Sequence, residues 1–253
     1  MINISQPLLN QTGQIRWALN NVASLISPPC SALQQLLTTN GTDFLQGSVV
    51  TPNQYNELTP FNSTGLGLQQ GDGSPVQIFV TDPKSPQPMP VKPVAGTHLV
   101  PLSMGDIVEV IIQNNPANSF NGDYRPAGVN RTAMEQHPMH MHGHHFWVLG
   151  YGNGSYISSE SNSELNMVNP PMRDTVTVFP GSYTVFRFVA DNPGTWLLHC
   201  HIFYHQYMGQ LLAFYYGLNQ LPPPPSTLPT CPASCIYTAA PWVSAINVML
   251  YIC

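Results

Sequence analysis

Apolar residues in this chain gather in short runs, and several of these runs alternate with polar residues. Runs with a period of two that are rich in β-branched and aromatic side chains predict strands, not helices. Turn signals such as "FPGS" and "DNPG" separate the later runs. We expect strands at residues 15–22, 76–80, 107–114, 145–151, 175–179, 183–190, 195–201 and 210–217. The spacing of strands from about residue 97 to 217 predicts an all-β fold, a Greek-key β-sandwich.

The remaining segments carry little pattern. Residues 23–95 are rich in Pro, Gly, Asn and Gln and predict long irregular loops, with one weak helical run at "SALQQLL". Beyond Gly217, the stretch "LNQLPPPPSTLPTCP" has polyproline character and leads into an apolar end that is shorter than the roughly 20 residues of a membrane-spanning helix. We therefore expect one domain over residues 1–220, with its core at about 97–217, followed by a Pro-rich connector and apolar tail over 221–253.

Composition narrows the possible partners. Charged residues make up only 8% of the chain, the formal net charge is -5, and no basic run occurs. This balance provides no electrostatic footprint for nucleic acid or for an anionic membrane surface, so we expect neither as a partner. The 26 prolines and 19 glycines favour a turn-rich β protein over a helical one.

Acceptor sequences for N-linked glycans are more frequent than this composition gives by chance. They begin at Asn3, Asn10, Asn40, Asn62, Asn130 and Asn153. Such sequences favour a secreted, extracellular glycoprotein as the parent. The start of the chain, "MINISQPLLNQTGQIRW", lacks the basic and apolar regions of a signal peptide, so we expect mature or internal sequence.

The histidines are strongly clustered. Eight of the nine lie in "HPMHMHGHH" (137–145) and "HCHIFYH" (199–205), and only His98 stands apart. Burying so many unpaired imidazoles would cost free energy, and metal coordination removes that cost. The two segments therefore predict metal binding.

The order of the donors predicts two metal sites on opposite faces of one strand. Side chains alternate along a strand, so His199 and His201 point one way and Cys200 points the other. His140 and His142 share a face in the same manner. One strand therefore carries donors for two different ions.

A thiolate with two imidazoles and a weak axial ligand is the donor set of blue copper. Here Cys200, His137 and His205 form that set, and Gln210 follows where a methionine commonly sits. Met208 is a competing axial ligand, which we disfavour because we expect it on another strand face. Zinc also accepts Cys and His, but a Cys flanked directly by two His fits closed zinc spacings poorly.

At these residues the chain resembles the multicopper oxidases, specifically the third, C-terminal cupredoxin domain of the plant-type ascorbate oxidases. The segments that carry the resemblance are "HPMHMHGHHFWVLGYG" and "FVADNPGTWLLHCHIFYHQYMGQ", with "GQIRWALNNVASLISPP" and "NPPMRDTVTVFP" matching less strongly. The resemblance covers about residues 2–217 and implies a cupredoxin-like β-sandwich.

The resemblance implies a role for each donor. His137, Cys200 and His205 would bind the type 1 copper that accepts electrons from substrate. The trinuclear centre that reduces dioxygen to water would use His140 at its type 2 copper, and His142, His199 and His201 at its type 3 pair. Electrons would pass from Cys200 through the adjacent backbone to His199 and His201. The family uses the residue matching His144 structurally, and His145 is expected to be incidental.

Two departures from the family pattern limit this reading. The family's trinuclear centre takes eight imidazoles, four of them from its first domain, and the histidines left over here, His98, His144 and His145, form no further H-x-H pair among themselves. We expect missing N-terminal cupredoxin domains, or another chain, to supply them. Gln210 stands where the relatives carry a thioether, and its harder oxygen donor favours Cu(II) over Cu(I). Cys231 pairs either with an absent partner or with Cys235.

The sequence thus predicts a copper-dependent oxidoreductase, or its C-terminal domain, that passes electrons from a small reductant to dioxygen. Ascorbate, phenols and metal ions all stay open as reductants, and a buried carboxylate beside His205, from Glu135 or Asp174, would favour metal ions. The alternative is a blue-copper electron-transfer module without oxidase activity. A fragment that binds no copper is a third possibility.

Overall fold

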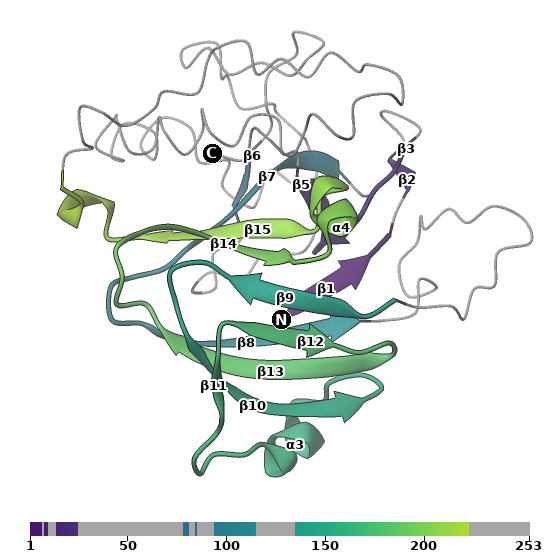
Figure 1. Ribbon diagram of the computed structural model, residues 1–253, viewed down its shortest axis with the longest axis vertical. Coiled ribbons are helices and arrows are strands. Elements are labelled where there is room, and N and C mark those ends of the chain that lie inside the picture. Colours follow the sequence, from purple (N-terminus) through teal and green to yellow (C-terminus); the bar gives the residue numbers. More distant parts are fainter. Residues whose placement is uncertain are drawn as a thin grey trace, which may run out of the picture.

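A computed structural model describes residues 1–6, 8–9, 14–24, 78–80, 84, 94–114 and 135–222 of the chain (Figure 1). The helical run expected at "SALQQLL", most of the expected loops, and the tail lie outside these residues, as do the four cysteines other than Cys200. The described residues are mostly strands, as the sequence predicts.

The strands in chain order are β1 (Ile2–Ser5), β2 (Leu8–Leu9), β3 (Gln14–Ile15), β4 (Ala18–Leu19), β5 (Val22–Ser24), β6 (Ile78–Val80), β7 (Val94–Pro101), β8 (Ile107–Asn114), β9 (His137–Met141), β10 (Phe146–Asn153), β11 (Met172–Arg173), β12 (Thr175–Val178), β13 (Ser182–Val189), β14 (Gly194–Cys200) and β15 (Leu211–Tyr216). Two short α-helices, α3 (Ser158–Ser161) and α4 (Phe203–Tyr207), and two single 3-10 turns, η4 (Asn162–Glu164) and η5 (Leu218–Gln220), interrupt them.

Apart from the β2–β3 hairpin, the strands join in one hydrogen-bonded order that folds into two layers. One layer runs β11-β10-β13-β8-β1-β4-β5, and the other runs β7-β15-β14-β9-β12, with β6 beside β7. Parallel pairing of β5 with β7 links the layers. Apolar side chains from both layers meet in a single core that includes Phe146, Phe186, Phe188, Met139, Leu198 and Leu212. The fold is therefore a β-sandwich.

Strands expected from residue 107 onward are confirmed to within two residues at each end. The prediction of a single strand at 15–22 is wrong, because a turn separates β4 from β5 within this range. Asn20 and Asn21 take positive φ angles of 55° and 60°, a left-handed conformation that asparagine tolerates better than most residues. The Asn20 side chain fixes the turn by accepting a hydrogen bond from the Asn3 amide (2.8 Å).

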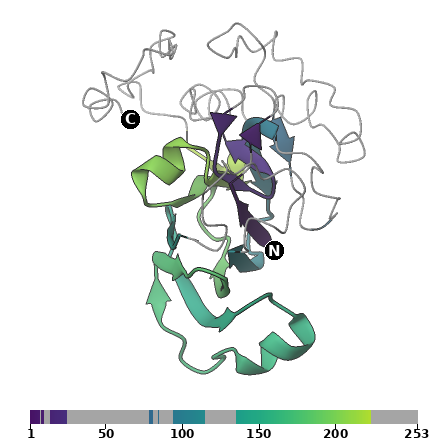
Figure 2. The same ribbon diagram turned by 90° about the vertical axis from the view of Figure 1, so that its right-hand side faces the viewer.

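The N-terminal strands lie beside the C-terminal part of the chain, as the purple and green segments of Figures 1 and 2 show. Backbone hydrogen bonds join them: the amide of Trp17 donates to the carbonyl of Met208, and the amide of Ser24 donates to the carbonyl of Gly209, each at 3.0 Å. Residues far apart in the sequence are thereby held against the loop between α4 and β15.

No helix within the described ranges is long and apolar enough to cross a lipid bilayer.

Candidate metal centres

Antiparallel pairing of β9 with β14 sorts the histidines onto two faces. His199 stands opposite His140, and Cys200 stands opposite Met139. Opposed residues on paired strands project to the same face, and neighbours along a strand project to opposite faces. Cys200 and His137 therefore share the face that lines the core, while His140 and His199 share the other face.

On the core face, His137, Cys200 and His205 form what we call the thiol cluster. Their three donor atoms lie within 4.8 Å of one another, and all three residues are buried. The Nδ1 atoms of His137 and His205 are 3.1 Å apart, and Cys200 Sγ lies 3.8 Å and 3.5 Å from them. Three residues separated by up to 68 positions thus converge on one point.

Burial favours the neutral forms of His137 and Cys200 when no cation is bound. Burial, and then the neighbouring His205, lowers the pKa of His137 to about 3. Burial raises the pKa of the Cys200 thiol to about 11, and the Glu135 charge adds to this rise. A thiolate here needs a bound cation for stabilisation, and neutral imidazoles offer their lone pairs. One sulfur and two nitrogen donors, buried and facing one another, fit copper.

Gln210 also lies in the interior near this cluster, with 0% of its surface exposed. Neither of its amide atoms, nor Nε2 of His137, has a hydrogen-bond partner among the described residues. The amide lies near enough to His137 to oppose the lowering of that pKa in part, but it falls short of hydrogen-bond geometry. Buried polar atoms without partners cost free energy, and a nearby cation would satisfy the carboxamide oxygen.

Met208 lies elsewhere than expected. It caps the C-terminal end of α4 with helical backbone angles, so the argument that places it on a strand face is wrong. Its side chain is partly buried against the main core.

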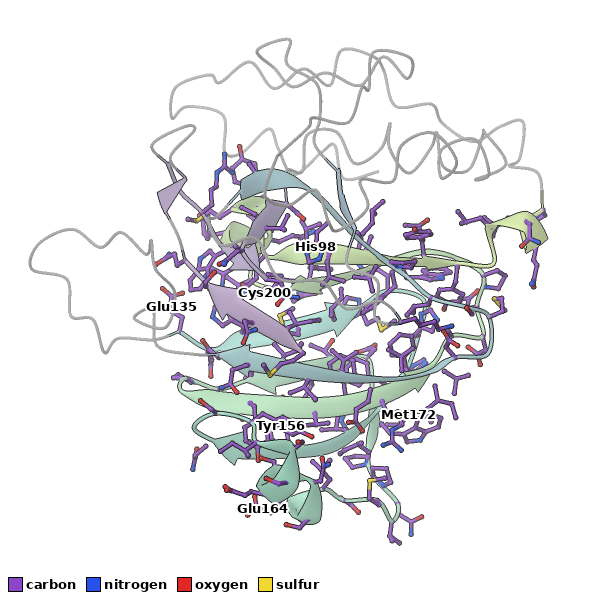
Figure 3. All side chains as sticks on the ribbon, turned by 180° about the vertical axis from the view of Figure 1, so that it is seen from behind. His98, Glu135, Tyr156, Glu164, Met172 and Cys200 are labelled. Atoms are coloured by element: carbon purple, nitrogen blue, oxygen red, sulfur yellow. The ribbon has the colours of Figure 1, made fainter. Side chains whose placement is uncertain are left out.

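Glu135 occupies the outer edge of the thiol cluster. His205 Nε2 lies 2.7 Å from the Glu135 carboxylate, and 61% of the Glu135 side chain is exposed. Figure 3 shows Cys200 in the interior and Glu135 towards the periphery. An Nε2–H that donates to Glu135 leaves Nδ1 of His205 free to face Cys200. Asp174, the other expected carboxylate, lies near His140 instead, at 4.0 Å from its Nδ1.

Trp17 is a part of the site that the sequence reasoning missed. Its ring centroid lies 4.6 Å from that of His137 and 4.8 Å from that of His205, and the side chain is buried. The only sequence signal is an aromatic residue in an apolar run, which is also typical of any core position. The ring closes one side of the thiol cluster.

On the other face, His140, His142 and His199 form what we call the imidazole cluster. Their donor atoms also lie within 4.8 Å of one another, and the Nε2 atoms of His142 and His199 are 3.0 Å apart. Burial, ahead of the neighbouring imidazoles, lowers the pKa of His142, and it lowers the pKa of His199 to about 4. Imidazole nitrogens gathered in this way fit a divalent cation.

Hydrogen bonds to the backbone select the nitrogen that each imidazole offers. His140 Nδ1 lies 2.9 Å from the Asp174 carbonyl and 3.0 Å from Thr175 Oγ1. His199 Nδ1 lies 3.0 Å from the Cys200 carbonyl. When these Nδ1–H groups donate, both Nε2 atoms are left for a metal.

His201 lies beside the imidazole cluster without joining it. Its ring stacks on His199 with centroids 5.7 Å apart, and it lies 5.4 Å from the ring of His140. His201 is exposed, and it is not among the three residues whose donor atoms lie within 4.8 Å. The alternation that puts His199 and His201 on one face is confirmed.

A buried network holds the turn that carries His142. His144 Nδ1–H donates to the His142 carbonyl (3.0 Å), and the Tyr216 hydroxyl donates to His144 Nε2. Gly143 has a φ of +66°, and a Cβ there would lie 2.3 Å from the Trp196 ring. The chain therefore needs glycine at this point to bring His142 back toward His199.

A sequence model described as multicopper oxidase matches residues 57–219. The chain is 37% identical to an L-ascorbate oxidase of Cucumis sativus over 209 residues, 83% of this chain and 29% of that protein. It is 35% identical to an L-ascorbate oxidase of Cucurbita pepo var. melopepo over 228 residues, 90% of this chain and 34% of that protein. Laccase-12 of Arabidopsis thaliana is 34% identical over 211 residues, 76% of this chain and 34% of that protein.

Among solved structures, the laccase from Botrytis aclada superposes with a TM-score of 0.50 at 22% identity, covering 87% of this chain and 28% of that one. This likeness concerns the fold, and it confirms the cupredoxin-like sandwich expected from the sequence. The chain spans about a third of the length of the curated relatives it matches.

Proposed function

This chain belongs to the multicopper oxidase family, whose members bind copper, and on that premise we propose that it is the third cupredoxin domain of an ascorbate oxidase-like enzyme. In this proposal residues 1–220 form the domain and residues 221–253 a connector and tail. The enzyme takes single electrons from a small reductant and passes them to dioxygen.

The observation that carries the proposal is the pair of clusters on opposite faces of β14. The thiol cluster and the imidazole cluster meet at the peptide bond between Cys200 and His199, and the His199 Nδ1–H donates to the Cys200 carbonyl at 3.0 Å. The two clusters are therefore joined both covalently and by a hydrogen bond. Copper, when bound, supplies one-electron redox chemistry at both clusters.

We assign the donors as the family pattern implies. His137, Cys200 and His205 would hold the type 1 copper, and Gln210 would supply a further, weaker oxygen donor. The buried, unpartnered amide of Gln210 supports this role. His140 belongs to the type 2 copper, and the type 3 pair takes His142, His199 and His201.

The chain's other residues keep these donors in place. Glu135 accepts from His205 Nε2–H, and Thr175 with the Asp174 carbonyl accepts from His140 Nδ1–H. Each hydrogen bond fixes one ring nitrogen as a donor and leaves the other to face its cluster. The Trp17 ring covers the His137 and His205 side of the thiol cluster and keeps water from it.

Ascorbate is the proposed reductant, because L-ascorbate oxidases are among the most similar relatives. Phenols are the second candidate, since laccases also match. Metal ions are less well supported: a buried carboxylate at the His205 edge would favour them, whereas Glu135 is 61% exposed. The electron-transfer module is not favoured, because the named relatives are oxidases.

The imidazole cluster needs ligands from outside this chain in order to form a complete oxygen-reducing centre. We propose that separate N-terminal cupredoxin domains, or another chain, supply them, consistent with the chain's span of about a third of its relatives. We also propose an extracellular location for the parent protein, which the glycan acceptor sequences support.

Copper content and oxygen uptake test the proposal together. The chain is produced with the preceding domains of its parent, loaded with copper, and supplied with ascorbate. We expect ascorbate-dependent uptake of dioxygen that falls at least tenfold in His142→Ala and is unchanged in His145→Ala, an exposed neighbour outside both clusters. Equal activity in the two variants, or no oxygen uptake by a copper-loaded protein, would contradict the proposed function.

A further inference from the structure

Two large aromatic side chains, one on β10 and one in the turn between β12 and β13, form an exposed pair. Tyr151 on β10 is 49% exposed, and Phe179, in the turn after β12, is 47% exposed. Their ring centroids lie 5.9 Å apart, with an interplanar angle of 57°. Exposed aromatic rings in contact with each other leave apolar surface in water, which a neighbouring group could cover.

The glycan acceptor sequence at Asn153 lies beside this pair. Asn153 ends β10 two residues after Tyr151, so both side chains project from the same face of the strand. The register places Tyr151 opposite Thr184 and Asn153 opposite Ser182 on β13. A Cβ at Gly152 would lie 2.1 Å from the ring of the buried Tyr183, so that face of the strand is filled, whereas Asn153, on the face of Tyr151, is exposed.

Space around the acceptor is open. Asn153, Gly154 and Ser155 are all exposed. Gly154 turns the chain with a φ of +74°, and no atom lies within 4 Å of a Cβ built there. The acceptor sequence is therefore exposed over its whole length, which an attached sugar chain requires.

The acceptor sequence at Asn3 has none of these features. Asn3 lies inside β1, which pairs with β4 on one side and β8 on the other. The hydroxyl residue of that acceptor sequence, Ser5, is 4% exposed, and its hydroxyl donates a hydrogen bond to Asn21 Oδ1 (3.5 Å). Among the described residues, only Asn153 combines an exposed acceptor with an exposed aromatic neighbour.

We propose that Asn153 carries an N-linked glycan whose first N-acetylglucosamine packs against the rings of Tyr151 and Phe179. The inference rests on the proposed extracellular location and not on the copper chemistry. In the transfer, Asn153 Nδ2 bonds to C1 of a lipid-diphosphate-linked sugar. The bond from C1 to the diphosphate breaks, the diphosphate leaves with the electron pair, and the amide loses one proton.

The packing follows from the shape of the sugar. One face of a pyranose ring carries mainly C–H groups, which contact an aromatic face favourably while the hydroxyl groups stay in water. Because Tyr151 and Asn153 are neighbours on one strand face, the first sugar reaches the ring without bending the strand. The glycan thus covers the apolar surface of the aromatic pair.

Occupancy is the first test. The full chain is directed by a leader through the secretory route of a eukaryotic cell that also secretes a known glycoprotein. The product is denatured and digested, and the peptide containing Asn153 is analysed by mass spectrometry. We expect a hexosamine-containing peptide that disappears in Ser155→Ala. A secreted chain in which Asn153 is unmodified, while the reference glycoprotein is modified, overturns the proposal.

A thermal double-mutant comparison tests the packing. Secreted protein is compared with Ser155→Ala, which lacks the glycan, first with Tyr151 present and then in a Tyr151→Ala background. We expect the glycan to raise Tm by about 2–4 °C with Tyr151 and by less than half as much without it. An equal rise in both backgrounds overturns the packing. Copper content of the same samples reports separately on the proposed function.

Discussion

Replacing Gly209 by Ala tests the turn that brings Gln210 to the thiol cluster. Gly209 lies between the end of α4 and the start of β15, with a φ of +114°. A Cβ there would lie 2.7 Å from the Trp17 carbonyl oxygen and 3.0 Å from both the amide nitrogen and the carbonyl oxygen of Ser24. All three are backbone atoms, so no rotamer change relieves the contact.

Two terms set the size of the effect. Forcing a residue with a Cβ into a positive-φ conformation costs about 1–2 kcal/mol. Overfilling a packed site adds about 1–3 kcal/mol. We expect Gly209→Ala to lower the free energy of unfolding by about 2–5 kcal/mol, a large part of the roughly 5–15 kcal/mol that stabilises a typical domain.

Gly105→Ala is the matched control. Gly105 has a φ of +82°, and nothing lies within 4 Å of a Cβ built there. It therefore carries the backbone cost alone, about 1–2 kcal/mol. The difference between the two variants isolates the contact of residue 209 with Trp17 and Ser24.

Urea denaturation of the copper-free chain measures both variants. We expect a lower midpoint with an unchanged m-value in each case, and a larger shift for Gly209→Ala. The close contact also displaces Gln210, so copper affinity should fall in Gly209→Ala and not in Gly105→Ala. If the two variants lose equal stability and bind copper equally, the backbone contacts of Trp17 and Ser24 do not restrict the residue at position 209.

Three further predictions concern His98, Glu135 and Tyr216. Burial lowers the pKa of His98 to about 4, from an ordinary value of 6.5, so its neutral form stabilises the fold fully above pH 6.5 and this contribution is lost as the pH falls toward 4. The free energy of unfolding of the wild type should therefore drop by about 3 kcal/mol more than that of His98→Gln between pH 7 and pH 4, and parallel curves would contradict the assignment. Glu135→Ala removes the acceptor for His205 Nε2–H and should weaken copper binding by about tenfold, as competition with a chelator measures, while Glu160→Ala, exposed on α3, should have no effect. Tyr216→Phe leaves the buried His144 Nε2 without its donor and should cost about 1–3 kcal/mol in chemical denaturation; a loss below 0.5 kcal/mol, the usual size of a surface substitution, would refute the role of this hydrogen bond.

Strands β8 and β13 of the first layer could be predicted because their composition is typical of strands. β8 and β13 are rich in β-branched and aromatic residues, and the turn between β12 and β13 contains Pro180 and Gly181. β9 was missed because Pro138 and two histidines replace the usual strand formers. The pairing of β9 with both β12 and β14 determines its conformation, and such tertiary pairing is not visible in local sequence.

The donors could be found from spacing, but their surroundings could not. H-x-H and H-C-H spacings fix faces through the alternation of a strand, which is local geometry. Trp17 lies 120 positions before His137 in the sequence, and only the fold brings it to the cluster. The short helix α4, which moves Met208 off the strand, has no side-chain cap at its N-terminus and gives little signal of its own.

The visible spectrum of the chain loaded with Cu(II) tests the central claim most directly, because an intense sulfur-to-copper charge-transfer band requires a thiolate bound to the metal. We predict this band in the wild type and its loss in Cys200→Ser, with the copper of the imidazole cluster unaffected. A loaded wild-type chain that shows only weak absorption, indistinguishable from that of Cys200→Ser, would contradict the account.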